Sequence, residues 1–185
     1  MQKNLAFLVK NKTLEKLRGL NAKLEQLHVD LTIFTDDELN HRPAPGVWSA
    51  LDNINHLKMS EGLSIQYLQK KLSGGTEELN KAGLKAKMRV MALTTFMRSK
   101  RKRKAPPVVD ETSFPEHSNL GELMDAWRNQ RKELHDFLTN QSDEVFTMEV
   151  YRHPFAGRMS LLGMLQFFDS HFDRHRKQIR RTLRE

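Results

Sequence analysis

Apolar side chains recur at intervals of three and four residues along most of this chain, the spacing that places them on one face of an α-helix. In the first long run they fall at Leu17, Leu20, Leu24, Leu27 and Leu31, with lysine, arginine and glutamate between them. The same periodicity predicts long helices at about residues 13–34, 49–73, 119–140 and 160–183. Helices that each carry one apolar face favour an all-α fold, a four-helix bundle.

The start of the second helix is marked by its own residues. Because Pro43, Pro45 and Gly46 cannot continue a helix, a loop of about a dozen residues should follow the first helix. Ser49 is placed to cap the second helix, and Asp52 follows three residues later. Its carboxylate suits the positive end of the helix dipole.

Two segments lie outside the four helices. The first is 1–10, where we expect Leu5, Phe7, Leu8 and Val9 to form a satellite of the core. The second is an insertion at about 76–117, between the second and third helices, whose first half has helical periodicity interrupted near Gly83. An accessory helix is therefore expected there.

A basic run at 97–104 lies within the insertion and is followed by Pro106 and Pro107. Such runs occur in nucleic-acid contacts and in nuclear-localisation signals. We favour a solvated surface loop, because no aromatic side chain lies among the charges to provide a stacking platform. A non-enzymatic basic protein that binds nucleic acid is nevertheless kept as an alternative.

Composition narrows the choice of chemistry. The 185 residues suit a single domain over 1–185, and the net charge of +8 is concentrated at 98–104 and 174–184. The chain has no cysteine, so any metal site must use His, Asp or Glu. It has neither an apolar run of about 18 residues nor a signal-peptide pattern, so we expect a cytoplasmic protein that does not enter membranes.

Two histidines occupy positions where the predicted last helix calls for apolar residues. The stripe that contains Leu161, Met164 and Phe168 continues into His171 and His175. Residues four apart lie one above the other on a helix, so both imidazoles can point at one metal ion. The pair alone is weak evidence, since histidines in a basic helix are more often hydrogen-bonded or solvated.

Two blocks of the sequence resemble the DinB/YfiT-like family of small metal-binding four-helix bundles. The first is Pro45-Gly46-Val47-Trp48-Ser49 with His56 and Glu61, and the second is His153-Pro154 and Gly157 with the segment from His171 to Ile179. The resemblance implies an up-down-down-up bundle and a metal triad of His56, His171 and His175. Zn²⁺ or Ni²⁺ is the metal that it implies.

The depths of these histidines agree with that triad without use of the family. His56 lies about eight residues after the start of its helix, and His171 and His175 lie about eleven and about seven residues before the end of theirs. At about 1.5 Å per residue these depths match within a few ångströms if the two helices are antiparallel. His153 is the main competing ligand, but we favour a structural role for it because the residue before Pro154 is held extended.

Three imidazoles without a fourth protein ligand leave a coordination position open, as in catalytic metal sites. Such an ion can acidify bound water or a bound thiol, so hydrolysis and thiol transfer are both chemically available. The resemblance implies a metal-dependent hydrolase or thiol S-transferase acting on a small molecule, with a low-molecular-weight thiol as one candidate. Asp52 could orient His56, and Glu61 could support the metal or act as an acid or base, but either could equally be a surface carboxylate. A metal kept for stability alone is a further alternative, and a homodimer is one candidate assembly.

Overall fold

The structure is a computed structural model that describes residues 2–99 and 109–184. Within these ranges the chain is mostly helical, with one small antiparallel hairpin. The helices are α1 (Gln2–Leu31), α2 (Asp36–Asn40), α3 (Ala50–Ser73), α4 (Leu84–Arg98), α5 (Leu120–Thr139) and α6 (Leu161–Thr182). The strands are β1 (Tyr151–His153) and β2 (Gly157–Met159), and short 3₁₀ turns cover Glu111–Ser113 and Asp143–Thr147.

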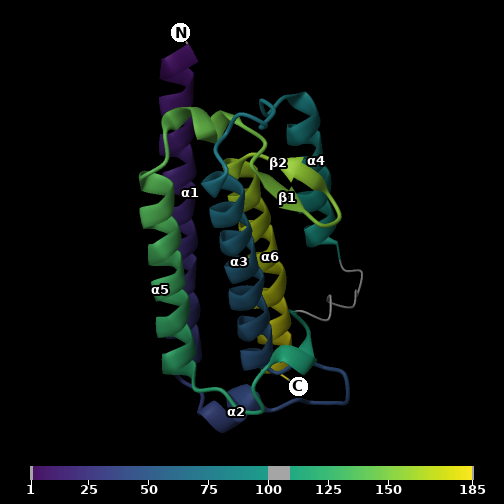
Figure 1. Cartoon of the computed structure of the whole chain (residues 1–185). Helices are drawn as coiled ribbons and strands as arrows, with labels where there is room; N and C mark the ends of the chain where they lie inside the picture. Colours follow the sequence, from purple (N-terminus) through teal and green to yellow (C-terminus); the bar gives the residue numbers. More distant parts are fainter. Residues whose placement is uncertain (1, 100–108, 185) are drawn as a thin grey trace.

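Four long helices, α1, α3, α5 and α6, form the bundle (Figure 1). Figure 1 shows α1 and α6 running in one direction and α3 and α5 in the other, which is the up-down-down-up order. The predicted all-α bundle is therefore confirmed. The described helices include none that is long and apolar enough to cross a membrane.

The bundle core is built from the seams that the periodicity predicts. Leu17, Leu20, Leu24, Leu27 and Leu31 of α1 are all buried. They belong to two apolar clusters, one towards each end of the bundle. Burial of leucine side chains stabilises a fold by about 1.5–3 kcal/mol each, so this one seam holds α1 firmly against its neighbours.

The first helix begins much earlier than predicted. It starts at Gln2 instead of near Thr13, and its first turns extend beyond the other bundle helices (Figure 1). Leu5, Phe7 and Leu8 are consequently exposed, so the predicted satellite of the core is wrong for these residues. Val9 alone of the predicted set packs against the core. The error arises because α1 continues past the end of its partners, so that in these turns only one side of the helix is covered: Ala6 is buried, whereas Leu5, Phe7 and Leu8 are not.

Capping interactions fix where α3 begins. The Ser49 side chain accepts a hydrogen bond from the Asp52 backbone N–H at 3.0 Å, and the Asp52 carboxylate accepts one from the Ser49 N–H at 2.9 Å. This reciprocal pair confirms the predicted helix start. The preceding loop is less irregular than expected, because Thr35 and Glu38 form a second capping box that starts the short helix α2.

The insertion contributes α4, which packs on α6 (Figure 1). The two helices approach closely at Gly163, where an added Cβ would lie only 2.7 Å from Val90 Cγ2. The residues before Gly83 are not helical, contrary to prediction, because the backbone at Asn80 and Ala82 pairs with Glu149 and Thr147. Of the basic run, only 97–99 lies within the described residues.

The connection between α5 and α6 folds into the β1–β2 hairpin, which lies beside α4 (Figure 1). Gly157 has a φ of +79°, a conformation that glycine adopts without strain. This hairpin and α4 together cover one side of the bundle, and the candidate site lies beneath them.

Candidate metal centre

The three predicted histidines converge inside the bundle. His56 comes from α3, whereas His171 and His175 lie one turn apart on α6. One ring nitrogen from each lies within 4.8 Å of those of the other two. The closest pair is His56 Nε2 and His171 Nε2, at 3.1 Å. All three side chains are buried, so their imidazole rings are largely desolvated.

Two of the imidazoles are oriented by hydrogen bonds from the nitrogen that faces away from the cluster. His56 Nδ1 donates to the Val109 carbonyl at 2.7 Å, and His175 Nδ1 donates to Asn53 Oδ1 at 2.8 Å. Because these oxygens can only accept, each Nδ1 carries the proton and each Nε2 keeps its lone pair. The Asn53 amide is itself fixed, since its Nδ2 donates to the Ser49 carbonyl. This arrangement is typical of metal-ligating histidines.

Burial keeps the three rings neutral. It lowers the pKa of His56 below the ordinary value, and it lowers the pKa of His171 and His175 well below it. The neighbouring Arg174 guanidinium adds to this lowering for the two α6 histidines. Neutral imidazole is the form that binds metal ions, so the donor set fits a divalent cation at neutral pH.

Aromatic side chains form the walls of the cluster. The Trp48 ring lies 5.0 Å from the His56 ring and stacks on His175 at 6.0 Å with an interplanar angle of 19°. Phe167 stacks on His171 at 5.2 Å and 16°. These rings exclude water from the sides of the cluster, so a charge held there would interact strongly with its neighbours.

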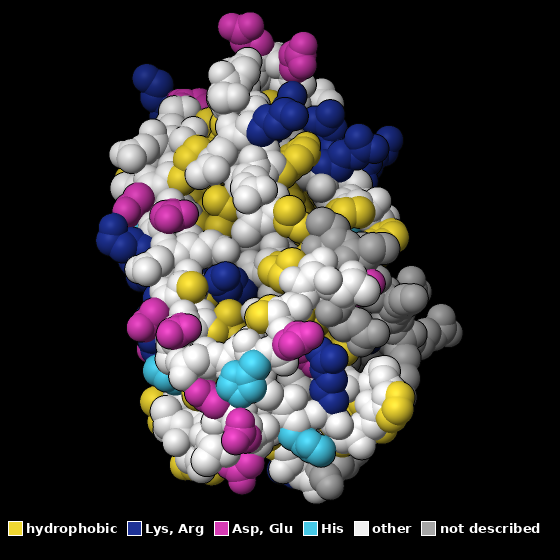
Figure 2. Space-filling model, turned by 60° about the horizontal axis from the view of Figure 1, so that its bottom comes forward, with side chains coloured by type: hydrophobic (Ala, Val, Ile, Leu, Met, Phe, Trp, Pro, Cys, Tyr) yellow, Lys and Arg dark blue, Asp and Glu magenta, His cyan; other side chains and the backbone are white. Residues whose placement is uncertain are grey.

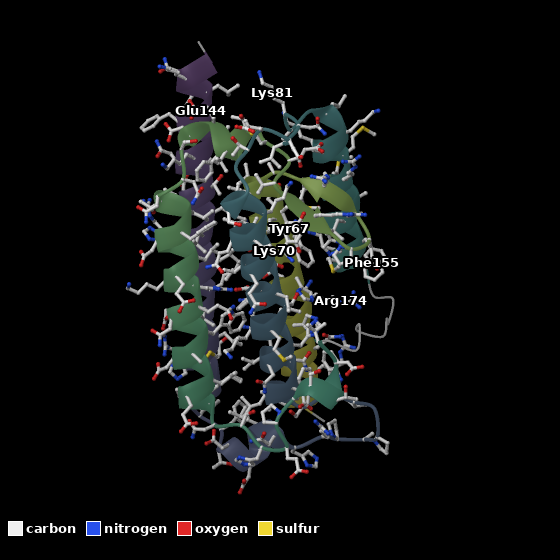
Figure 3. All side chains as sticks on the ribbon, viewed as in Figure 1. Tyr67, Lys70, Lys81, Glu144, Phe155 and Arg174 are labelled. Carbon is white, nitrogen blue, oxygen red and sulfur yellow. The ribbon has the colours of Figure 1, made fainter. Side chains whose placement is uncertain are left out.

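A cavity of about 1470 Å³ opens onto the histidines. Its walls come from α3, α4, the hairpin and α6, and its apolar lining includes Leu63, Leu93 and Phe96. Figure 3 shows the labelled residues Tyr67, Phe155 and Arg174 on this side of the bundle. Arg174 directs its Nη1 at the Met97 and Ser99 carbonyls, where it ties the end of α4 to α6. Among the described residues, none closes this cavity off from the histidine cluster.

A model of the DinB superfamily matches residues 16–179, which is most of the chain. The protein belongs to the DinB superfamily. The matched range contains α3 and α5, the second half of α1, most of α6, and all three clustered histidines. No curated protein and no solved structure matches the chain. Membership in the DinB superfamily thus agrees with the expected bundle, whereas the reaction has to be argued from the site.

The two carboxylates proposed for this DinB site are engaged elsewhere. Asp52 accepts two hydrogen bonds from Arg42, at 2.6 and 2.9 Å, in addition to its capping bond. It does not orient His56, because the Val109 carbonyl does so. That prediction is wrong: the side chain of a first-turn residue is drawn to the helix N-terminus rather than along the helix.

Glu61 likewise forms a structural pair. It accepts hydrogen bonds from Arg131 at 2.8 and 2.9 Å and from Trp127 Nε1 at 2.8 Å. Arg131 also donates to the Leu20 carbonyl, so the pair joins α1, α3 and α5. Both charged side chains are almost completely buried. The carboxylate is therefore directed at α5 and is held there by two donors, an arrangement that assigns it no part in acid–base chemistry.

His153 also lies in the cavity wall, but its geometry disfavours ligation. Its Nδ1 accepts hydrogen bonds from the backbone N–H groups of Phe155 and Ala156, both at 3.2 Å. Its ring packs edge-on against Phe167, and burial lowers its pKa to about 4. The structure thus supports the expectation that His153 is structural, because it holds the turn of the hairpin.

The sequence did not reveal the groups that orient the imidazoles. For Asn53 the only hint is its spacing, because a residue three positions before His56 lies on the same side of α3, where it is buried. Val109 had none, because the group that matters is a backbone carbonyl brought to the site by the connection between α4 and α5. The side chain at such a position carries no information about the contact.

Proposed function

We propose that this DinB protein is a metal-dependent enzyme in which His56, His171 and His175 hold one divalent ion, with Zn²⁺ or Ni²⁺ as the favoured metals. The observation that carries this proposal is the convergence of three buried, neutral imidazoles at the floor of an open cavity. A structural site would be expected to contain a fourth protein ligand. Among the described residues, no Asp, Glu or further His joins these three in a cluster close enough to share an ion.

The favoured reactions are hydrolysis and thiol S-transfer. A divalent ion in such a site supplies Lewis acidity, which polarises a carbonyl and acidifies a coordinated water or thiol. The protein contributes Asn53 and Val109, which direct the imidazole lone pairs, and Trp48 and Phe167, which exclude water. The Arg174 charge beside the cluster favours a substrate that becomes negative during reaction.

Of the two reactions we favour transfer of a low-molecular-weight thiol to an electrophilic acceptor. The apolar lining of the cavity, which includes Leu63, Leu93 and Phe96, would receive an apolar acceptor. The thiol would have to come from outside, because the protein has no cysteine.

Metal analysis of the untagged protein tests the ligand set. We expect about one divalent ion per chain, lost or bound at least 10- to 100-fold more weakly in His56→Ala, His171→Ala and His175→Ala. His153→Ala and His135→Ala are matched controls that should retain it. Retention of one tight ion by His56→Ala and His171→Ala would remove the basis of the proposed chemistry.

A screen of the metal-loaded protein against esters, amides and thiol–electrophile pairs tests the reaction. Turnover that a chelator abolishes and the identified ion restores would support an enzyme. An ion that raises the thermal midpoint, without turnover of any member of the screen, would instead favour a metal kept for stability.

A further inference from the structure

One of the two basic regions of the chain belongs to a long segment without acidic residues, which also contains α4. Between Asn80 and Val109 the sequence contains ten lysine and arginine residues and no aspartate or glutamate. The whole chain has 31 basic and 23 acidic residues, so the remainder has 21 basic and 23 acidic residues. This segment therefore has a net charge of +10, which exceeds the +8 of the whole chain. Four of its basic residues lie in α4, and the five at 100–104 lie outside the described residues.

The outer face of α4 is also apolar. Leu84, Met88 and Met91 follow one another at helical spacing and are 72%, 55% and 65% exposed. The opposite face of the same helix is buried on the bundle through Val90 and Leu93. A helix with apolar residues on both sides is normally covered on both sides, yet no described residue covers this stripe.

Cations flank the stripe. Lys81, Lys85 and Lys87 are exposed, and none of them forms an ion pair with another described residue. In Figure 2, lysine and arginine side chains gather at the upper right, on the side where α4 lies, beside hydrophobic side chains. Figure 3 shows Lys81 at the upper end of this side and Phe155, which is 80% exposed, at its lower part.

We propose that the outer face of α4, together with Phe155, docks onto a bilayer that contains anionic phospholipid. Lipid headgroups would neutralise the lysines, and the interfacial region would take up the three apolar side chains and the Phe155 ring. Lysine stems are long enough to keep their ammonium groups at the headgroups while the stripe enters the interface. An anionic bilayer would therefore both neutralise the lysines and remove the exposed apolar side chains from water.

Nucleic acid would complement the positive charge of this face but not its apolar side chains. Phosphates would neutralise the lysines, but they would leave Leu84, Met88 and Met91 in water. Non-specific recognition of single strands also stacks successive bases on several aromatic rings, whereas Phe155 is the one exposed ring in this face as the described residues define it. The bilayer proposal departs from our sequence-based expectation that membranes play no part. It does not depend on the proposed metal chemistry.

Docking would place the bilayer next to the cavity. The inner side of α4 lines that cavity through Leu93, Phe96 and Met97, and Phe155 lines it from the hairpin. The same helix would therefore contact lipid with one face and the cavity with the other. An apolar substrate dissolved in the bilayer would have a short route to the histidines.

Vesicle flotation of the full chain tests the proposal. The probes are vesicles of phosphatidylcholine alone and of phosphatidylcholine mixed with phosphatidylglycerol. We expect binding to the mixed vesicles only, weakened by salt. Lys85→Gln/Lys87→Gln should bind about fivefold more weakly for each lysine removed. Leu84→Gln/Met88→Gln/Met91→Gln should bind at least about tenfold more weakly at unchanged charge.

Matched controls separate docking from general stickiness. Val29→Gln/Ile33→Gln removes two apolar side chains that are 63% and 81% exposed, one at the end of α1 and one just after it. Lys12→Gln/Arg18→Gln removes two exposed cations from α1. Both controls should bind vesicles as the parent protein does. Because every substituted side chain is exposed and glutamine is a good helix former, helicity by circular dichroism should be unchanged in all variants.

Three outcomes would overturn the proposal. The first is equal binding to both vesicle types, and the second is parent-like binding by the two α4 variants. The third is binding to single-stranded RNA, without binding to vesicles, that the lysine variant weakens and the Leu84/Met88/Met91 variant leaves intact. That last result would assign the face to nucleic acid.

Discussion

Single atoms decide whether three nearby histidines can act as ligands. His56 and His175 present Nε2 to the cluster because each donates its Nδ1 proton to an oxygen on the far side. Without such a partner, a neutral imidazole can place its proton on either nitrogen, and the wrong tautomer would aim an N–H at the metal position. The identity of the residue at position 53 therefore matters as much as that of a ligand.

Substitution of Asn53 tests this orienting role. Asn53→Ala should weaken metal binding by about 10- to 100-fold, the range found when a ligand loses its orienting group. Asn53→Asp should restore most of the affinity, because a carboxylate accepts the same Nδ1 proton and makes the imidazole a better donor. The measurement is a competition titration with a chromophoric chelator. Equal affinities for Asn53→Ala and the parent would show that the hydrogen bond has no influence.

At the scale of helices, the buried Glu61–Arg131 pair joins three of the four bundle members. Arg131 lies between Trp127 and Phe172 with its guanidinium 4.7 Å from the indole centroid, and it donates to Glu61 and to the Leu20 carbonyl. The two opposite charges therefore neutralise each other through hydrogen bonds. Removal of one member would leave the other charge buried without a partner.

Removal of either member alone should be strongly destabilising. Glu61→Ala or Arg131→Ala should lower the free energy of unfolding by about 3–5 kcal/mol. Glu61→Met/Arg131→Met should cost less than either single change, because no uncompensated charge remains. Urea denaturation measures the difference, and metal stoichiometry of the folded fraction is the control. A double variant as unstable as the sum of the single ones would contradict the pairing argument.

The helices also show which features a sequence can predict. The bundle seams and the start of α3 follow from spacing and capping, because those signals act within one element. The burial of Arg131 on α5 does not follow from such signals, because an arginine is buried there only where Glu61 compensates its charge. The non-helical stretch before Gly83 depends on backbone pairing with residues 147–149. Both depend on partners distant in the sequence, which local periodicity does not contain.

For the whole molecule, the buried histidines make stability depend on pH. Burial lowers the pKa of His171 and His175 well below 6.5, and that of His153 to about 4. In the unfolded chain histidines titrate near about 6.5. As the pH falls from about 6.5 towards about 4, the unfolded state therefore takes up protons that the folded state does not, and folding stability is lost.

The metal-free protein should accordingly unfold more easily in mild acid. Each such histidine lowers the free energy of unfolding by about 1.4 kcal/mol per pH unit below about 6.5, and contributes nothing above it. Urea midpoints at about pH 7.5 and about pH 5 measure the effect. His153→Gln should reduce the slope by one histidine's share. A midpoint that does not change between these pH values would contradict the neutral, buried state of the rings.

The positions of the ligands in the chain give an ion at this site a second role. His56 and His171 are 115 residues apart in the sequence, and the chain has no cysteine with which to form a cross-link. An ion held by both would close that loop as a disulfide does, but reversibly. At a free concentration 100 times its dissociation constant, it would add about 2.7 kcal/mol to stability. The amount of folded protein in a cell would then follow the supply of the metal.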